Sequence, residues 1–177
     1  MTTEAPPLDL RRLNSCSVEE FADLLDGVFE DARALVVRAA ELRPFSDVAA
    51  LHTALVMQVE ALPEDELVAF LSSHPELAGQ QARTGTMTVS STREQALLNL
   101  GQLPEAETRR WNVLNAHYRE RFGFPFIVRV AEHDYASLLA VFGKRLENER
   151  AEELRIATSE VAKISRQRLA TRLGGLV

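Results

Sequence analysis

Cysteine is nearly absent from this sequence, since Cys16 is the only one among 177 residues. A single thiol cannot form an internal disulfide, and it excludes four-thiolate zinc sites and Cys-x-x-Cys redox chemistry. This use of cysteine fits a reducing compartment, and we expect a cytoplasmic protein.

Positive charge and long apolar runs are also scarce. The chain has 20 Lys and Arg against 26 Asp and Glu, a net charge of −6. Nucleic-acid binding needs a basic face, so we expect no nucleic-acid partner. No stretch reaches the roughly 18 apolar residues of a membrane span. The first ten residues, MTTEAPPLDL, lack the basic start and apolar run of a secretory signal. We therefore expect no membrane partner.

Standard catalytic motifs are missing too. The sequence has no Walker loop, no G-x-G-x-x-G, no H-E-x-x-H and no G-x-S-x-G. The four histidines, His52, His74, His117 and His133, do not stand at metal-ligand spacing from one another. We therefore predict no metal site.

What the sequence does contain is helical periodicity along nearly its whole length. Hydrophobic residues make up 46% and charged residues 26%, as in ordinary globular domains. We predict an all-α fold, a single-domain bundle of about seven to nine helices with irregular connecting loops. Residues 1–12 are expected to form a flexible N-terminus, and residues 13–177 the helical domain.

Several local signals divide this pattern into helices. Ser17-Val-Glu-Glu20 resembles a capping box, followed by an apolar stripe that runs to Ala32. Pro63 ends one helix and can open the next. Residues 79–90 are polar and include Gly85, which predicts a loop whose composition would permit it to close over a ligand. Gly123 is placed to cap a helix C-terminus. The last helix is predicted to turn five apolar residues inward: Leu154, Ala157, Val161, Ile164 and Leu169.

His74-Pro75 is the first candidate for chemistry. Proline fixes its own φ and disfavours the α region for the residue before it. His74 would then be a general acid or base at a helix N-terminus. It could equally be a residue that merely caps a helix starting at Pro75, Glu76 and Leu77.

Ser91, Glu94 and Gln95 form the second candidate. Ser-x-x-Glu is the pattern of a capping box, in which both side chains bind backbone N–H groups. Alternatively, a helix start here presents free N–H groups to an anionic ligand. Gln95 can both donate and accept hydrogen bonds, as a urea-like ligand requires.

Two further segments could take part in a site. FGFPFIVRV, residues 122–130, is rich in aromatic and β-branched residues and contains Pro125, so we expect extended chain. It either closes the core or offers its backbone N–H and C=O groups to an amide-rich ligand. In KISRQR, residues 163–168, the arginines are either solvated or turned inward to hold a carboxylate.

Together and in this order, these elements resemble one family. HPELAG (74–79), Ser91-x-x-Glu94-Gln95, RFGFPFI (121–127) and KISRQRL (163–169) are similar to the 2-oxo-4-hydroxy-4-carboxy-5-ureidoimidazoline (OHCU) decarboxylases, and LRPF (42–45) resembles the family's Arg-Pro-Phe element. The resemblance extends from about Leu13 to Leu169.

The resemblance implies an all-α homodimer without a cofactor that converts this ureidoimidazoline to (S)-allantoin and CO2 during urate degradation. His74, Glu94 and Arg168 would be the catalytic residues. Eleven residues would line the substrate site: Pro75, Ser91, Thr92, Arg93, Glu94, Gln95, Phe126, Ile127, Val128, Arg129 and Val130.

Roles follow from the chemistry that the resemblance implies. His74 would handle the proton of the substrate hydroxyl, and Glu94 would orient His74 or bind ureido N–H groups. Ser91 and Gln95 would hold the urea-like groups, and Arg168 an anionic oxygen. The backbone of residues 126–130 would fix the ring.

The sequence also departs from the family pattern. Leu98-Asn99 stands where the family often has a small Ala-Gly pair, and Arg129 and Val130 occupy positions where smaller residues are common. Two alternatives stay open: a catalytically silent helical interaction module, or an enzyme acting on a related ureido compound.

Overall fold

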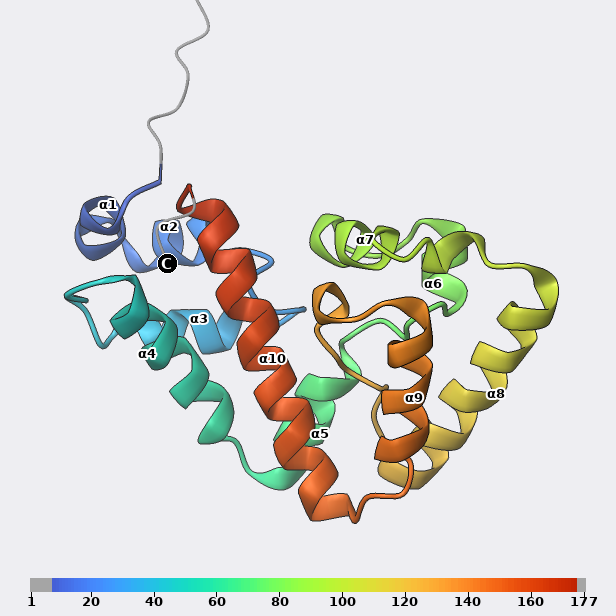
Figure 1. Ribbon diagram of the computed structural model, residues 1–177. Helices are drawn as coiled ribbons and strands as arrows, with labels where there is room; N and C mark the ends of the chain where they lie inside the picture. Colours follow the sequence, from blue (N-terminus) through green and yellow to red (C-terminus); the bar gives the residue numbers. More distant parts are fainter. Residues whose placement is uncertain (1–7, 175–177) are drawn as a thin grey trace, which may run out of the picture. The chain divides into compact units, whose positions relative to one another are not determined.

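A computed structural model describes residues 8–174, and these residues fold into helices joined by turns and loops (Figure 1). They contain ten α-helices and two short 3-10 helices, η1 and η2, without a strand. Eight of the α-helices have seven or more residues, so the prediction of an all-α fold is confirmed. No helix among the described residues is long and apolar enough to cross a membrane.

The chain divides into two compact units. One comprises residues 1–62 and 165–177, and the other residues 63–164. The first unit contains α1 (Leu10–Ser15), α2 (Val18–Leu24), α3 (Arg33–Ala40) and α4 (Val48–Glu60). It also includes the last part of α10 (Arg150–Arg172). Of the segment predicted to precede the domain, residues 1–7 lie outside the described part, and residues 10–12 belong to α1.

In the first unit, the sequence predicted where a helix starts better than where it ends. Ser17 caps α2 by accepting the N–H of Glu20, as predicted. The predicted stripe to Ala32 is wrong as one helix, because α2 ends at Leu24 and α3 begins at Arg33. Gly27 (φ 76°) and Asp31 (φ 42°) adopt left-handed conformations between them, which no helix can contain.

The LRPF element joins the helices of this unit. The Arg43 guanidinium donates to the carbonyls of Ala40, Leu13 and Cys16 at 2.7, 3.2 and 2.6 Å. The side chain of Asn14 exchanges two hydrogen bonds with the backbone of Phe45. A single guanidinium thus binds carbonyls at the ends of α1 and α3, where the last turn of a helix has no further N–H of its own to offer.

The second unit begins with α5 (Glu64–Ser72), α6 (Gln80–Thr84) and α7 (Val89–Ala96). It continues through η1 (Leu100–Gln102), α8 (Glu105–Phe122), η2 (Val130–Glu132), α9 (Tyr135–Arg145) and the first part of α10. Gly123 caps α8 in a left-handed conformation, as predicted. The prediction of an uninterrupted loop at residues 79–90 is wrong, because α6 and the first two residues of α7 lie within it.

Aromatic rings fill the core of this unit. Tyr118 of α8 is fully buried and contacts three phenylalanine rings edge-on, at 5.5 to 5.9 Å between centroids: Phe124, Phe126 and Phe142. Residues 123–129 are not helical, as predicted, and place Phe124 and Phe126 in this cluster. The two ends of the predicted extended segment differ, because Phe122 is the last residue of α8 and Val130 the first of η2. The same packing anchors residues 126–130, the segment expected to contact a ligand.

Candidate functional site

His74 lies directly after the C-terminus of α5, in a turn that continues to Gly79. Its backbone N–H donates to Leu71 at 3.2 Å, and its ring contacts Phe70 edge-on at 5.4 Å. The expectation of a helix N-terminus at His74, and of a helix starting at Pro75, is wrong. Pro75 disfavours the α region for His74 and ends α5, and residues 75–79 turn without starting another helix.

Side chains from three helices hold the carbonyls of this turn. Gln95 of α7 donates to the carbonyl of Glu76 at 3.2 Å and accepts the N–H of Ala78 at 3.0 Å. Asn115 of α8 donates to the carbonyl of Leu77 at 2.9 Å, and Arg83 of α6 to that of Ala78 at 2.7 Å.

Ala78 needs this support because its φ of 51° is left-handed, a conformation unfavourable for any residue with a Cβ. The surrounding bonds therefore fix the turn beside His74, which is itself 7% exposed. A buried imidazole next to a rigid turn is a suitable arrangement for directed proton transfer.

The Ser91–Gln95 segment lies within α7 rather than before it. Thr88 is the N-cap and accepts the N–H of Ser91 at 3.3 Å, so the capping box predicted at Ser91 is wrong. Ser91 and Gln95 are buried, one helical turn apart, while Thr92 and Arg93 are exposed and Glu94 is half-buried. Gln95 serves the turn after His74, a role that the sequence did not predict.

Residues 126–130 approach the same helix, since η2, which starts at Val130, packs against α7. Phe126, Ile127, Val128 and Val130 are each at most 4% exposed, whereas the Arg129 side chain reaches Glu132 at 3.0 Å. The second unit therefore contains three of the predicted elements: His74-Pro75, Ser91–Gln95 and Phe126–Val130.

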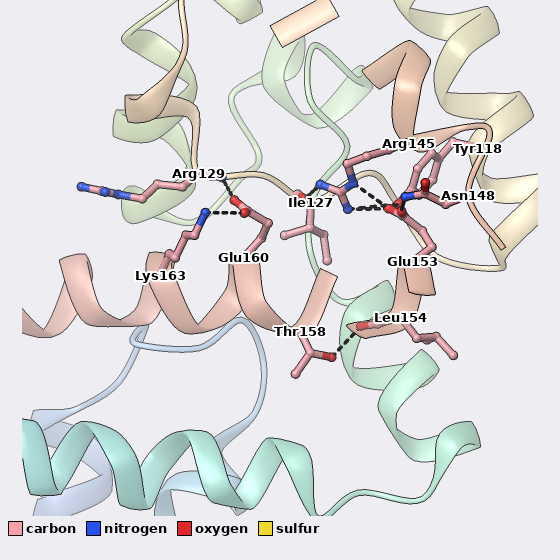
Figure 2. A network of polar contacts seen from close by, with 10 residues as sticks. All are labelled: Tyr118, Ile127, Arg129, Arg145, Asn148, Glu153, Leu154, Thr158, Glu160 and Lys163. Carbon is pink, nitrogen blue, oxygen red and sulfur yellow. Dashed lines mark hydrogen bonds and ion pairs between the residues drawn. The ribbon is translucent and has the colours of Figure 1, made fainter. Parts of the chain in front are cut away.

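Charged side chains bind this segment from α9 and α10, as Figure 2 shows. Arg145 donates to the carbonyl of Ile127 at 2.6 Å, and Glu160 accepts the N–H of Arg129 at 2.8 Å. Arg145 is in turn bound by Glu153 at 2.7 Å, a carboxylate that also contacts the Tyr118 hydroxyl. Burial, and the hydrogen bond to Glu153, raise the pKa of Tyr118 far above its usual range.

Arg168 belongs to the first unit, where it is 6% exposed. Its guanidinium lies 3.0 Å from the Glu30 carboxylate, which is 3% exposed, and 3.4 Å from the carbonyl of Gly27. Arg168 is therefore turned inward, as one of the two interpretations of KISRQR predicted. Glu30 was not predicted.

Comparison with known proteins identifies the family. The model for OHCU decarboxylase matches residues 14–170. The chain belongs to the OHCU decarboxylase family.

Relatives of the OHCU decarboxylase family occur across distant organisms. The chain is 36% identical to the 2-oxo-4-hydroxy-4-carboxy-5-ureidoimidazoline decarboxylase of Mus musculus, over 94% of each chain. It is 33% identical to that of Haloferax volcanii, over 93% of this chain and 96% of the relative. A third relative is the uric acid degradation bifunctional protein PucL of Bacillus subtilis. It is 35% identical over 89% of this chain, which spans 31% of PucL.

Two solved structures share the fold of this OHCU decarboxylase family member. One is an (S)-allantoin synthase, with a TM-score of 0.75 and 25% identity, covering 94% of this chain and 54% of its own. The other is an OHCU decarboxylase in the presence of (S)-allantoin, with a TM-score of 0.61 and 20% identity, covering 80% and 91%.

The departure at Leu98-Asn99 has a local explanation. Asn99 precedes η1 in a left-handed conformation, with φ of 51°, and is exposed. Asparagine tolerates this conformation better than most residues other than glycine. The substitution therefore preserves the turn that a glycine would make.

Three polar residues at the site were missed, although the sequence carries a signal for each. Asn115 stands at helical spacing within the buried stripe of Trp111, Tyr118 and Phe122. Arg145 and Glu153 likewise occupy inward positions of their helices and are 5% and 0% exposed. A polar residue on an apolar stripe indicates a buried hydrogen-bonding role, because an unpaired one would be costly.

Proposed function

We propose that this chain converts 2-oxo-4-hydroxy-4-carboxy-5-ureidoimidazoline to (S)-allantoin and CO2 in urate degradation. The observation that carries the proposal is the match to the OHCU decarboxylase family over residues 14–170. The buried His74, next to a turn that Gln95 and Asn115 hold, agrees with it.

The substrate's own structure provides for the loss of CO2. Its carboxylate is attached to a carbon next to a C=N bond. When the C–CO2 bond breaks, the electron pair enters the imine, so the substrate acts as its own electron sink. The protein's tasks are to orient the scissile bond, to stabilise the developing negative charge and to deliver a proton to one face.

We assign the proton transfers to His74. Its imidazole takes the proton of the substrate hydroxyl as CO2 leaves and returns a proton to one face of the ring, which gives one enantiomer. Glu94 orients this ring or binds the ureido N–H groups. Arg168 binds an anionic oxygen of the substrate, and its contact with Glu30 restricts the guanidinium to one geometry.

The test follows (S)-allantoin by circular dichroism in a mixture of urate, urate oxidase, hydroxyisourate hydrolase and this protein. We expect a fast signal from the unmodified chain. His74→Asn should lower the rate by about 10²–10⁴-fold, the usual contribution of positioned acid–base catalysis. The matched control is His117→Asn on the exposed face of α8, which should keep the rate.

Other outcomes separate the alternatives. Slow formation of racemic allantoin, equal to the reaction without the protein, would support a silent helical module. Full activity of His74→Asn would overturn the role of His74. Turnover of a related ureido compound, without turnover of this substrate, would identify a different decarboxylase.

The resemblance also predicts a homodimer and a cytoplasmic location. The low cysteine content agrees with a reducing compartment. Light scattering coupled to size exclusion gives the mass of the assembly, and twice 19.7 kDa is the expected result.

A further inference from the structure

Val128 lies between two peptide groups that carry charged partners. The Ile127 carbonyl accepts a hydrogen bond from the Arg145 guanidinium at 2.6 Å. The Arg129 N–H donates to the Glu160 carboxylate at 2.8 Å. Figure 2 shows that Arg145 and Glu160 reach this short stretch of backbone from α9 and α10.

The two bound groups belong to the same peptide units as the N–H and C=O of Val128. The peptide between residues 127 and 128 carries the Ile127 carbonyl and the Val128 N–H. The next peptide carries the Val128 carbonyl and the Arg129 N–H. Among the described residues, neither the N–H nor the carbonyl of Val128 has a hydrogen-bond partner, although Val128 is 4% exposed.

A charge bound at one end of a peptide group changes the hydrogen-bonding strength of the other end. The C–N bond has partial double-bond character, so electron density drawn to a bound carbonyl leaves the N–H more positive. A cation on the Ile127 carbonyl therefore makes the Val128 N–H a stronger donor. By the same resonance, an anion on the Arg129 N–H makes the Val128 carbonyl a stronger acceptor. Hydrogen bonds in a chain strengthen one another in this way.

Both charged groups are held in place. Arg145 lies over the ring of Phe126 at 4.6 Å and is bound by Glu153 at 2.7 Å, which also accepts from Asn148 at 2.8 Å. Glu160 is bound by Lys163 at 2.7 Å. The side chain of Arg145 is 6% exposed and that of Glu160 10%, so water screens neither contact strongly.

We propose that Arg145 and Glu160 are positioning residues that polarise the two peptide groups around Val128, so that its N–H and C=O bind a ligand with neighbouring acceptor and donor atoms. An amide or ureido group has this pattern, with a C=O beside an N–H. The proposal rests on the proposed function and deepens it, because it assigns recognition of the ureido group to one residue's backbone and to two side chains behind it.

Glu160→Gln tests the polarisation. Glutamine keeps an acceptor oxygen for the Arg129 N–H but removes the charge. We expect KM for the ureidoimidazoline to rise by about two- to tenfold, because weaker polarisation lowers the strength of the Val128 hydrogen bonds. The kcat should change less, since ground state and transition state share these bonds. Glu152→Gln removes the same charge from an exposed position of α10 and should leave both constants unchanged.

A second measurement does not depend on turnover. In the ligand-free protein, the carbonyl-13C resonance of Val128 should move in Glu160→Gln and stay in Glu152→Gln. If the unmodified chain makes no (S)-allantoin, the proposed function is wrong. The NMR comparison of the two variants still tests whether Glu160 polarises the Val128 carbonyl. If the unmodified chain is active but Glu160→Gln and Glu152→Gln have the same KM or the same Val128 resonance, this inference is wrong.

Discussion

The Glu30 carboxylate lies 3.0 Å from the Arg168 guanidinium, and both side chains are almost completely buried. Glu30→Gln would remove the carboxylate that faces the buried Arg168 guanidinium. We expect a loss of about 3–5 kcal/mol in the free energy of unfolding, measured by urea denaturation, because a broken buried pair leaves one charge uncompensated.

The same unit contains a matched control for this prediction. Asp23 and Arg33 form an ion pair at 2.7 Å whose side chains are 68% and 51% exposed. Asp23→Asn should cost less than about 1 kcal/mol, as exposed pairs do. If the two variants lose equal stability, burial does not determine the strength of the Glu30–Arg168 pair.

Asn115 provides a second prediction, for the turn after His74. Asn115→Asp keeps the size of the side chain but loses the donor to the Leu77 carbonyl. We expect a loss of about 1–3 kcal/mol in stability, because a buried acceptor loses its partner. Hydrogen exchange of the Ala78 N–H should also become faster. The control is Glu120→Gln, a change of one charge at an exposed position of the same helix, which should change neither quantity.

Two glycines give opposite predictions for the same substitution. A Cβ at Gly79 would lie 2.8 Å from the Cβ of Glu76 and 3.1 Å from its carbonyl oxygen, so the turn must shift. Gly79→Ala should cost about 1–3 kcal/mol and lower the rate of (S)-allantoin formation. Gly143 in α9 has no atom within 4 Å of an added Cβ. Gly143→Ala should therefore stabilise by about 0.5–1 kcal/mol. Thermal denaturation of both variants checks the two signs.

Tyr118 predicts how stability depends on alkaline pH. Its pKa is raised in the folded protein, chiefly by burial, so the folded state keeps a proton that the unfolded state releases above about pH 10. The contribution to stability is complete below that pH and is lost as the pH rises further. The raised pKa of Lys163, caused mainly by its hydrogen bond to Glu160, acts in the same direction.

Tyr118→Phe isolates this contribution. The free energy of unfolding of Tyr118→Phe should fall less steeply above about pH 10 than that of the unmodified chain. In Tyr135→Phe, Tyr118 is the remaining tyrosine, and its phenolate absorbance should appear only as the protein unfolds. Phenolate absorbance from a folded Tyr135→Phe protein would contradict the prediction.

Elements defined by local chemistry were predictable from the sequence. Ser17 caps α2, Gly123 ends α8, and Pro63 stands between α4 and α5, because these positions depend on backbone conformation and on neighbouring hydrogen bonds. The five inward residues of the last helix are all buried, since a 3.6-residue period determines which face is apolar.

The site was less predictable, because its geometry depends on partners distant in sequence. Ser-x-x-Glu at residues 91–94 satisfies the capping pattern, yet Thr88 is the cap and α7 begins at Val89. Gln95 was expected to bind a ligand, and the structure shows it holding the backbone of Glu76 and Ala78. No local pattern indicates that an amide on one helix will bind a turn 19 residues earlier.

Asn115 and Tyr118 are neighbours on the buried face of α8. Asn115 donates to the Leu77 carbonyl, and the Tyr118 hydroxyl donates to Glu153, which binds Arg145 behind the Ile127 carbonyl. The turn of residues 74–79 is bound by the first, and the support behind residues 126–130 includes the second. Exchanging either segment with a homologue would therefore require grafting α8 as well. A chimaera that receives both segments together with residues 105–122 should keep the backbone conformation of both segments. A chimaera that receives one segment alone should not.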